Sequence, residues 1–152
     1  MKTTILNVLL GLTVILFAFQ SCEDDENETK ISSYTSSESH NTGQNCMNCH
    51  KEGGSGEGVF TAAGTIYQSD QSTTYPGATV KLYSEANGGG TLIANIAVDQ
   101  KGNFYTTQQI AFGNGLYVQV EGNSGTKNMV SSITTGACNS CHGSNVDPVW
   151  VE

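Results

Sequence analysis

Two copies of one five-residue pattern are the part of this sequence most suited to chemistry. The pattern Cys-x-x-Cys-His occurs at Cys46–His50 and again at Cys138–His142. It is the attachment pattern of a c-type haem, because two thiols three positions apart can form thioethers to the two vinyl groups of one haem. The adjacent imidazole can then take an axial position on the iron. The sequence therefore predicts two covalent haem c groups.

The repetition favours haem over the other uses of paired cysteines. Such pairs also form disulfides, and four converging cysteines can hold a structural zinc ion. These alternatives describe a non-catalytic binding or adhesion lipoprotein at the cell surface. They leave the histidine after each second cysteine without a role, in a chain with only three histidines. The haem prediction assigns covalent attachment to Cys46, Cys49, Cys138 and Cys141, and proximal iron ligation to His50 and His142.

The sequence does not identify the distal ligand of either iron. His40 is the only other histidine, so at most one site can be bis-histidine within this chain. His40 is one candidate for a distal ligand, and the alternative is that it is an exposed histidine without a role. Met129 is the other candidate, with ordinary core packing as its alternative, and a site open to water or to a partner's ligand is a third arrangement. Methionine raises a haem potential relative to histidine, so mixed ligation would give two haems of different potential.

The N-terminal segment predicts export. A basic residue, Lys2, precedes an apolar run over residues 5–19, which is the pattern of a secretory signal and is short for a membrane-spanning helix. The following Ser21-Cys22 resembles a bacterial lipoprotein processing site. That resemblance implies a signal peptide over residues 1–21, a lipid on Cys22 and an outer-membrane lipoprotein of the cell envelope, facing the periplasm or the outside. It also accounts for the fifth cysteine, the one outside the two motifs.

The charge balance limits the class of partner. The chain has no arginine, six lysines and 14 carboxylate residues, for a net charge of −8. This argues against nucleic acid or an anionic surface as the partner, and predicts redox partner proteins with a basic or neutral docking face. The sequence shows no paired-carboxylate signature, nucleophile elbow or further histidine cluster. It favours an electron-transfer protein over an enzyme with a dedicated substrate.

Composition divides the mature chain into four segments. Residues 22–45 are acidic and rich in serine, which predicts a flexible tether. Residues 46–58 form a first haem-binding segment, whose glycines we expect to make a flexible connection, or to let backbone pack closely against a haem face. Residues 59–135 alternate between apolar and polar positions, and residues 136–152 form the second haem-binding segment and tail.

The alternation over residues 59–135 predicts an all-β fold, an antiparallel β-sandwich of six or seven strands flanked by irregular haem-binding segments. Glycine-rich turns separate the strands. We expect six strands, roughly at 59–67, 78–84, 91–98, 103–109, 115–121 and 127–134. An even number of antiparallel strands would bring both motifs to one pole of the sandwich, and a seventh would send them to opposite poles.

Three stretches of the sandwich region resemble the carboxypeptidase-regulatory-like, prealbumin-type domain. They are Gly64–Tyr67, Tyr75–Tyr83 with its Pro-Gly-Ala-x-Val element, and Val98–Tyr105 with its Asp-x-x-Gly-x-Phe element, in the order that the family shows. The resemblance covers about half of the chain. Because that family is a structural and binding module, it implies a scaffold and not an activity.

Overall fold

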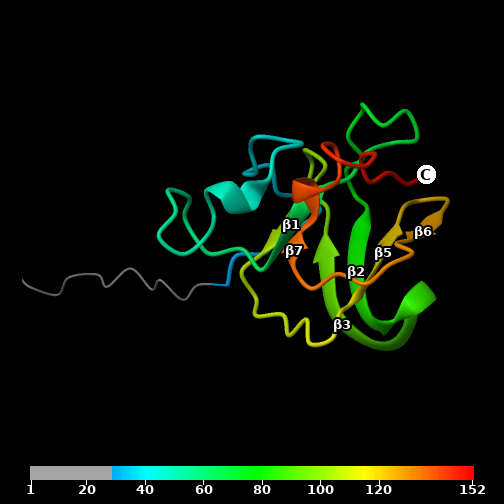
Figure 1. Cartoon of the computed structure of the whole chain (residues 1–152). Helices are drawn as coiled ribbons and strands as arrows, with labels where there is room; N and C mark the ends of the chain where they lie inside the picture. Colours follow the sequence, from blue (N-terminus) through cyan, green and yellow to red (C-terminus); the bar gives the residue numbers. More distant parts are fainter. Residues whose placement is uncertain (1–28) are drawn as a thin grey trace, which may run out of the picture.

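The computed structural model describes residues 29–152 as an all-β sandwich of two sheets (Figure 1). One sheet has three strands in the order β4-β1-β7, and the other has four in the order β3-β2-β5-β6. The predicted fold class is confirmed. The strands are β1 (Ala62–Thr65), β2 (Thr79–Glu85), β3 (Gly89–Ala97), β4 (Asn103–Thr106), β5 (Tyr117–Glu121), β6 (Thr126–Asn128) and β7 (Gly136–Ala137). Three short 3-10 turns accompany them: η1 (Cys46–Asn48), η2 (Ala86–Gly88) and η3 (Cys138–Ser140).

The four-stranded sheet follows the expected alternation. On β2, Val80 and Leu82 are buried while their neighbours are partly exposed, as expected for a sheet with one face on the core. The register on β3 shifts between the pairs Leu82–Ala94 and Tyr83–Leu92, which places one extra residue in β3. Such a bulge reverses the facing of the residues beyond it. Strict alternation would place Leu92 on the core face with Ala94, but Leu92 is 46% exposed.

The central strand β1 is buried along its whole length, where the alternation predicts a half-buried strand. Ala62, the first residue of β1, and Ile66, which follows the strand, belong to the apolar core between the sheets. The side chain of Thr65 is covered from outside the sheet, because its hydroxyl accepts hydrogen bonds from the backbone of Gly43 and from the side chain of Asn139. The segments that carry the two motifs therefore shield a strand that would otherwise face water.

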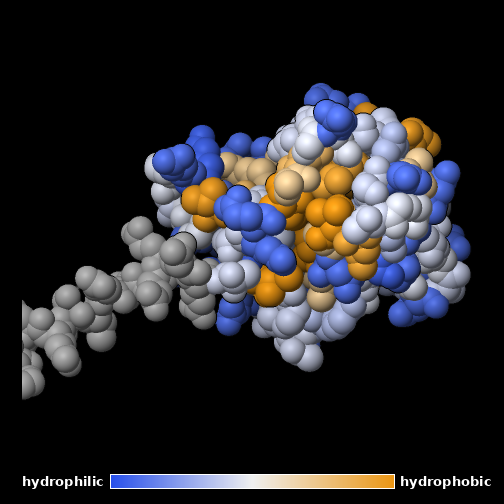
Figure 2. Space-filling view, turned by 90° about the horizontal axis from the view of Figure 1, so that it is seen from below, coloured by the Kyte–Doolittle hydropathy of each residue, from blue (hydrophilic) through white to orange (hydrophobic). Residues whose placement is uncertain are grey.

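The core fills the space between the two sheets. Its fully buried side chains include Phe104, Ile66, Leu82, Ile96 and Val80. Seen from below (Figure 2), apolar side chains also reach the surface in one central, elongated area with hydrophilic side chains on both sides. Concentrated apolar surface of this kind marks interaction or ligand sites more often than scattered apolar residues do.

The strand count differs from the expectation in one respect that matters for the motifs. Six strands lie where the sequence places them, although the sixth is shorter than the predicted 127–134. The additional strand is β7, which pairs in parallel with β1 through Ala62–Gly136 and Ala63–Ala137. The rule that a seventh strand separates the motifs is wrong for this chain, because β7 does not continue the antiparallel order. It instead carries the second motif to the side of β1.

The segment before the first motif is ordered against the sandwich. The sequence predicts a flexible tether over residues 22–45, but Ser32 is buried, its amide donates to the carbonyl of Tyr105, and its hydroxyl donates to that of Ala97. Ser39 is buried too. These buried hydroxyl groups are tolerated because each has a hydrogen-bond partner. The partner is a backbone carbonyl for Ser32 and the side-chain amide of Asn103 for Ser39. The predicted signal peptide, Cys22 and the acidic run over residues 23–28 lie outside the described residues.

Within residues 29–152, no helix has the length and apolar character needed to cross a bilayer.

Candidate functional site

The two Cys-x-x-Cys-His motifs fold into the same local structure. In the first, the amides of Cys49 and His50 both donate to the carbonyl of Cys46, with N···O distances of 3.2 and 3.0 Å. In the second, the amides at the same two places donate to the carbonyl of Cys138, again at 3.2 and 3.0 Å. Each turn is a 3-10 helix that ends at the second cysteine in a right-handed helical conformation. Two segments with different intervening residues thus present their cysteines and histidine in the same way.

Both motif histidines are oriented by a hydrogen bond through the same ring nitrogen. Nδ1 of His50 lies 2.9 Å from the carbonyl oxygen of Glu57, and Nδ1 of His142 lies 2.8 Å from that of Asp147. A carbonyl only accepts, so Nδ1 carries the proton and Nε2 is the lone-pair nitrogen. This is the arrangement by which proteins fix the tautomer and direction of a metal-binding histidine. Nε2 of each ring is therefore prepared to bind a metal.

Each motif lines a cavity of its own. His50 and both cysteines of the first motif line a cavity of about 860 Å³, with polar walls from residues 38–45 and 55–57. His142 and both cysteines of the second motif line another of about 590 Å³, which reaches the core side chains Phe104 and Val80. Both volumes lie in the range of about 300–1,000 Å³ that is typical of cofactor sites.

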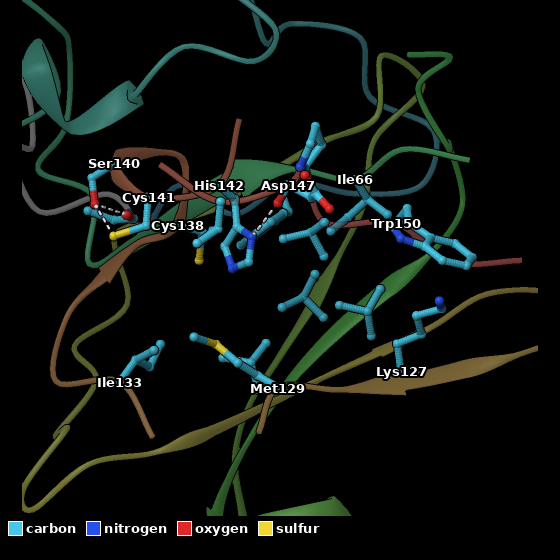
Figure 3. A pocket seen from close by; sticks show the side chains of 18 of the residues that line it. Ile66, Lys127, Met129, Ile133, Cys138, Ser140, Cys141, His142, Asp147 and Trp150 are labelled. Atoms are coloured by element: carbon cyan, nitrogen blue, oxygen red, sulfur yellow. Dashed lines mark hydrogen bonds between the residues drawn. The ribbon is translucent and has the colours of Figure 1, made fainter. Parts of the chain in front are cut away.

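The two distal-ligand candidates lie in different cavities. His40 lines the first cavity, and its ring centroid is 5.6 Å from that of His50, with a tilt of 39° between the rings. Met129 lines the second cavity, and Figure 3 shows its side chain below that of His142, across the open space. Met47, which the sequence places on the proximal side of its haem, is among the described wall residues of neither cavity.

The glycines after the first motif serve close packing against the motif itself. The sequence leaves open a flexible connection or packing against a haem face, but the loop returns to the motif through hydrogen bonds from Gly56 N to Cys49 O and from Phe60 N to His50 O, each 3.0 Å. A Cβ on Gly56 would lie 2.7 Å from Nδ1 of His50. The Phe60 ring stacks on the His50 ring, with the two centroids 4.0 Å apart. The loop and Phe60 together hold the histidine ring.

Replacing Gly56 by alanine should disturb the first site. The added methyl group forces apart the loop and the His50 ring, and we expect a loss of about 1–3 kcal/mol in the free energy of unfolding. Denaturant unfolding of the full chain measures this loss. The matched control is Ser55→Ala at the exposed neighbouring position, expected within about 0.5 kcal/mol of the parent. Equal behaviour of both variants would show that the ring is not held by this contact.

One residue that the sequence analysis did not single out connects the two motifs. Asn139, between the cysteines of the second motif, is 8% exposed. Its Nδ2 donates to the carbonyl of Gln44 (3.1 Å) and to the hydroxyl of Thr65 (3.0 Å), and its Oδ1 accepts from the amide of Thr65 (3.1 Å). Gln44 lies two residues before the first motif. In Figure 1, η1 and η3 accordingly lie beside β1 and β7 at one side of the sandwich, so the two motifs meet there.

The first cysteine of each motif is more enclosed than the second. Cys46 and Cys138 are partly buried, whereas Cys49 and Cys141 are exposed. Desolvation raises the pKa of the Cys46 thiol. Desolvation, and to a lesser degree the neighbouring Cys46, raises the pKa of Cys138 to about 12. Both are therefore neutral thiols at neutral pH.

The four motif cysteines are free thiols, with no disulfide between them. Among residues 29–152, no group of three or more histidine, cysteine or acidic side chains is placed to hold a metal ion directly. A haem fits the donors that are present: two thiols on one turn, one oriented imidazole and one cavity, in each of two places.

Fold and site define a class of protein: an all-β sandwich that carries two folded Cys-x-x-Cys-His turns side by side. Comparisons with known proteins add no relative, since no family model, no curated protein and no solved structure matches the chain.

Proposed function

We propose that this chain is a di-haem c-type cytochrome that transfers electrons at the bacterial cell envelope. The observation that carries the proposal is the repetition of one arrangement. Each motif has the same backbone turn, a histidine with Nδ1 bonded to a carbonyl and Nε2 left for iron, and a cavity of cofactor size. A structural disulfide requires neither the histidine nor the cavity.

In this function the chain's residues would bind the two haems, orient them and cover them. Cys46 and Cys49 would hold one haem, and Cys138 and Cys141 the other, through thioether bonds. His50 and His142 would be the proximal ligands, and their carbonyl partners would fix the ring orientation that iron binding through Nε2 requires. Bound haem supplies a one-electron iron couple. The sandwich fixes the relative position of the two sites, because both motifs are anchored to the same end of β1.

The location and partners follow from the sequence. Acylation of Cys22 by several chains would anchor the protein stably in a membrane, and an outer-membrane lipoprotein, periplasmic or surface-exposed, accounts for the export signal. The net charge of −8 favours redox proteins with a basic or neutral docking face. The carboxypeptidase-regulatory-like resemblance assigns the sandwich the part of a scaffold.

Haem content tests the proposal directly. The full chain is produced in a host with c-type haem maturation, denatured, and examined by absorption spectroscopy and mass spectrometry. We expect a covalent haem spectrum and a mass increase of two haems. Colourless protein of apoprotein mass would overturn the cytochrome assignment. A gain of one haem would overturn the assignment for one motif, and Cys-to-Ser changes in each pair would show which.

A further inference from the structure

We propose that the two sites have different distal ligands, His40 opposite His50 in the first and Met129 opposite His142 in the second. The site with methionine would have the higher potential, so that electrons move from the first site to the second. This inference rests on the proposed function and adds to it the ligand set and the direction of transfer.

His40 is held in position although its own side chain is exposed. The residue before it, Ser39, is buried, and its hydroxyl accepts from Nδ2 of Asn103 at 2.9 Å. The same Nδ2 reaches the hydroxyl of Thr42, two residues after His40, at 2.9 Å. Lys101 donates from Nζ to the carbonyl of Ser39 at 2.6 Å. These hydrogen bonds fix the backbone on both sides of His40.

The separation of the two histidines suits a shared metal. Their centroids are 5.6 Å apart and the rings are tilted by 39°, so the imidazoles are not stacked on each other. Metal–nitrogen bonds are about 2 Å long, which puts two imidazoles on opposite sides of one ion at a centroid distance of roughly 6 Å. The distance between His40 and His50 is of that order. Both imidazole rings therefore line the first cavity at a separation that one metal ion could bridge.

Met129 is held on the wall of the second cavity that faces the histidine. Its amide donates to the carbonyl of Val118 on β5 at 2.8 Å, which extends the pairing of β5 with β6 by one residue. Figure 3 shows the thioether reaching from this wall into the cavity, while the His142 ring enters from the opposite wall. Met129 is only partly buried. A core methionine would be surrounded by apolar contacts, whereas this one borders the cavity with the His142 ring on its far side.

The two candidates cannot exchange sites. His40 borders the first cavity and Met129 the second, and neither is among the described residues of the other cavity. Since the sequence has three histidines and two of them are proximal, the second site has no histidine left for its distal position.

The surroundings of the sites reinforce the difference in potential. The first cavity is walled by a mixture of aromatic and polar side chains, and the polar ones include the carboxylates Glu38 and Glu57 together with Lys30. The second is bounded largely by apolar core side chains, with Lys127 and Asp147 as the charged residues at its margin. A haem iron that is further from water and from carboxylates is less stable in its more positive ferric state. Ligand and environment therefore both raise the potential of the second site.

The transfer step exchanges one electron and no atoms. With haem held by both motifs, the first site would give up one electron and the second site would accept it. An external one-electron donor protein would reduce the first site, and an external acceptor protein would reoxidise the second.

The test uses the full-chain holoprotein with both haems, as established by mass. Redox titration followed by absorption spectroscopy should show two steps of different potential, and a half-reduced sample should retain the ferric bis-histidine signal. Ferric protein should show the absorption band of a methionine–iron bond. Met129→Leu should abolish that band and lower only the higher potential. Met47→Leu is the matched control and should change neither.

His40→Gly should remove the bis-histidine signal in electron paramagnetic resonance and shift only the lower potential. Added imidazole should restore the signal, which separates ligation from any structural effect at this exposed position. Two haems with one common potential, a persistent band in Met129→Leu, or an unchanged signal in His40→Gly would overturn the ligand assignment. None of these outcomes affects the cytochrome proposal, which fails only if covalent haem is missing.

Discussion

Loss of the second cysteine pair, through Cys138→Ser with Cys141→Ser, should remove one covalent haem and sharply destabilise the protein. The second cavity, of about 590 Å³, is lined by the core residues Ile66, Val80, Phe104 and Val120, so its occupant completes the packing between the sheets. Emptying such a space costs on the order of 3–5 kcal/mol. For a domain of this size, the melting temperature should fall by about 10 °C or more.

The matched control is Cys46→Ser with Cys49→Ser in the first motif. This variant also loses one haem, but its cavity has polar walls and takes in few core side chains, and water can fill it at little cost. Thermal unfolding of both variants, after their single haem has been verified by mass, measures the difference. Equal melting temperatures would contradict a role for the second group in core packing.

Asn139→Ala should destabilise the protein and disturb the first site, although Asn139 belongs to the second motif. The change leaves the carbonyl of Gln44 and the amide of Thr65 without the partner that they have in the structure. A buried polar group left unpaired costs about 1–3 kcal/mol, and Thr65 is buried, so we expect a loss of about 1–3 kcal/mol in the free energy of unfolding. Denaturant unfolding measures this loss, and redox titration of a variant that retains only the first haem measures the effect on that site.

Asn48→Ala provides the comparison for Asn139. Asn48 also lies between the cysteines of a motif, but it is exposed and its side chain accepts only from Nδ2 of Asn45 at 3.3 Å. We expect a change of no more than about 0.5 kcal/mol. If the two alanine variants lose similar stability, the Asn139 hydrogen bonds do not join the motifs in the way described.

The alternation of residue types predicted most of the sheet structure. Val80 and Leu82 on β2 face the core as expected, because a strand with one buried face must alternate. The alternation places Leu92 wrongly on the core face. The bulge in β3 depends on pairing with β2 and leaves no mark in the local sequence pattern. The two-residue strand β7 was not predicted either, because its formation depends on a partner about 75 residues earlier in the chain.

For the site, the sequence identified the chemical groups and the structure arranged them. The two motifs, the lack of a fourth histidine and the candidates His40 and Met129 follow from residue types and spacing alone. The role of Asn139 had no such signal, because asparagine is common in polar segments and only burial with three hydrogen bonds sets this one apart. The order in residues 30–45 was also missed, since their composition is that of a tether.

The sequence by itself determined which thiols and imidazoles are available, and that no more than one site can have two histidines. Only the tertiary structure decided that the motifs meet on β1, and that His40 and Met129 border different cavities. Spacing along the chain fixes the chemistry of a single turn, because the backbone brings neighbouring residues together in every fold. Contacts between distant segments depend on strand pairing and on the satisfaction of buried polar groups, which become defined only when the whole chain has packed.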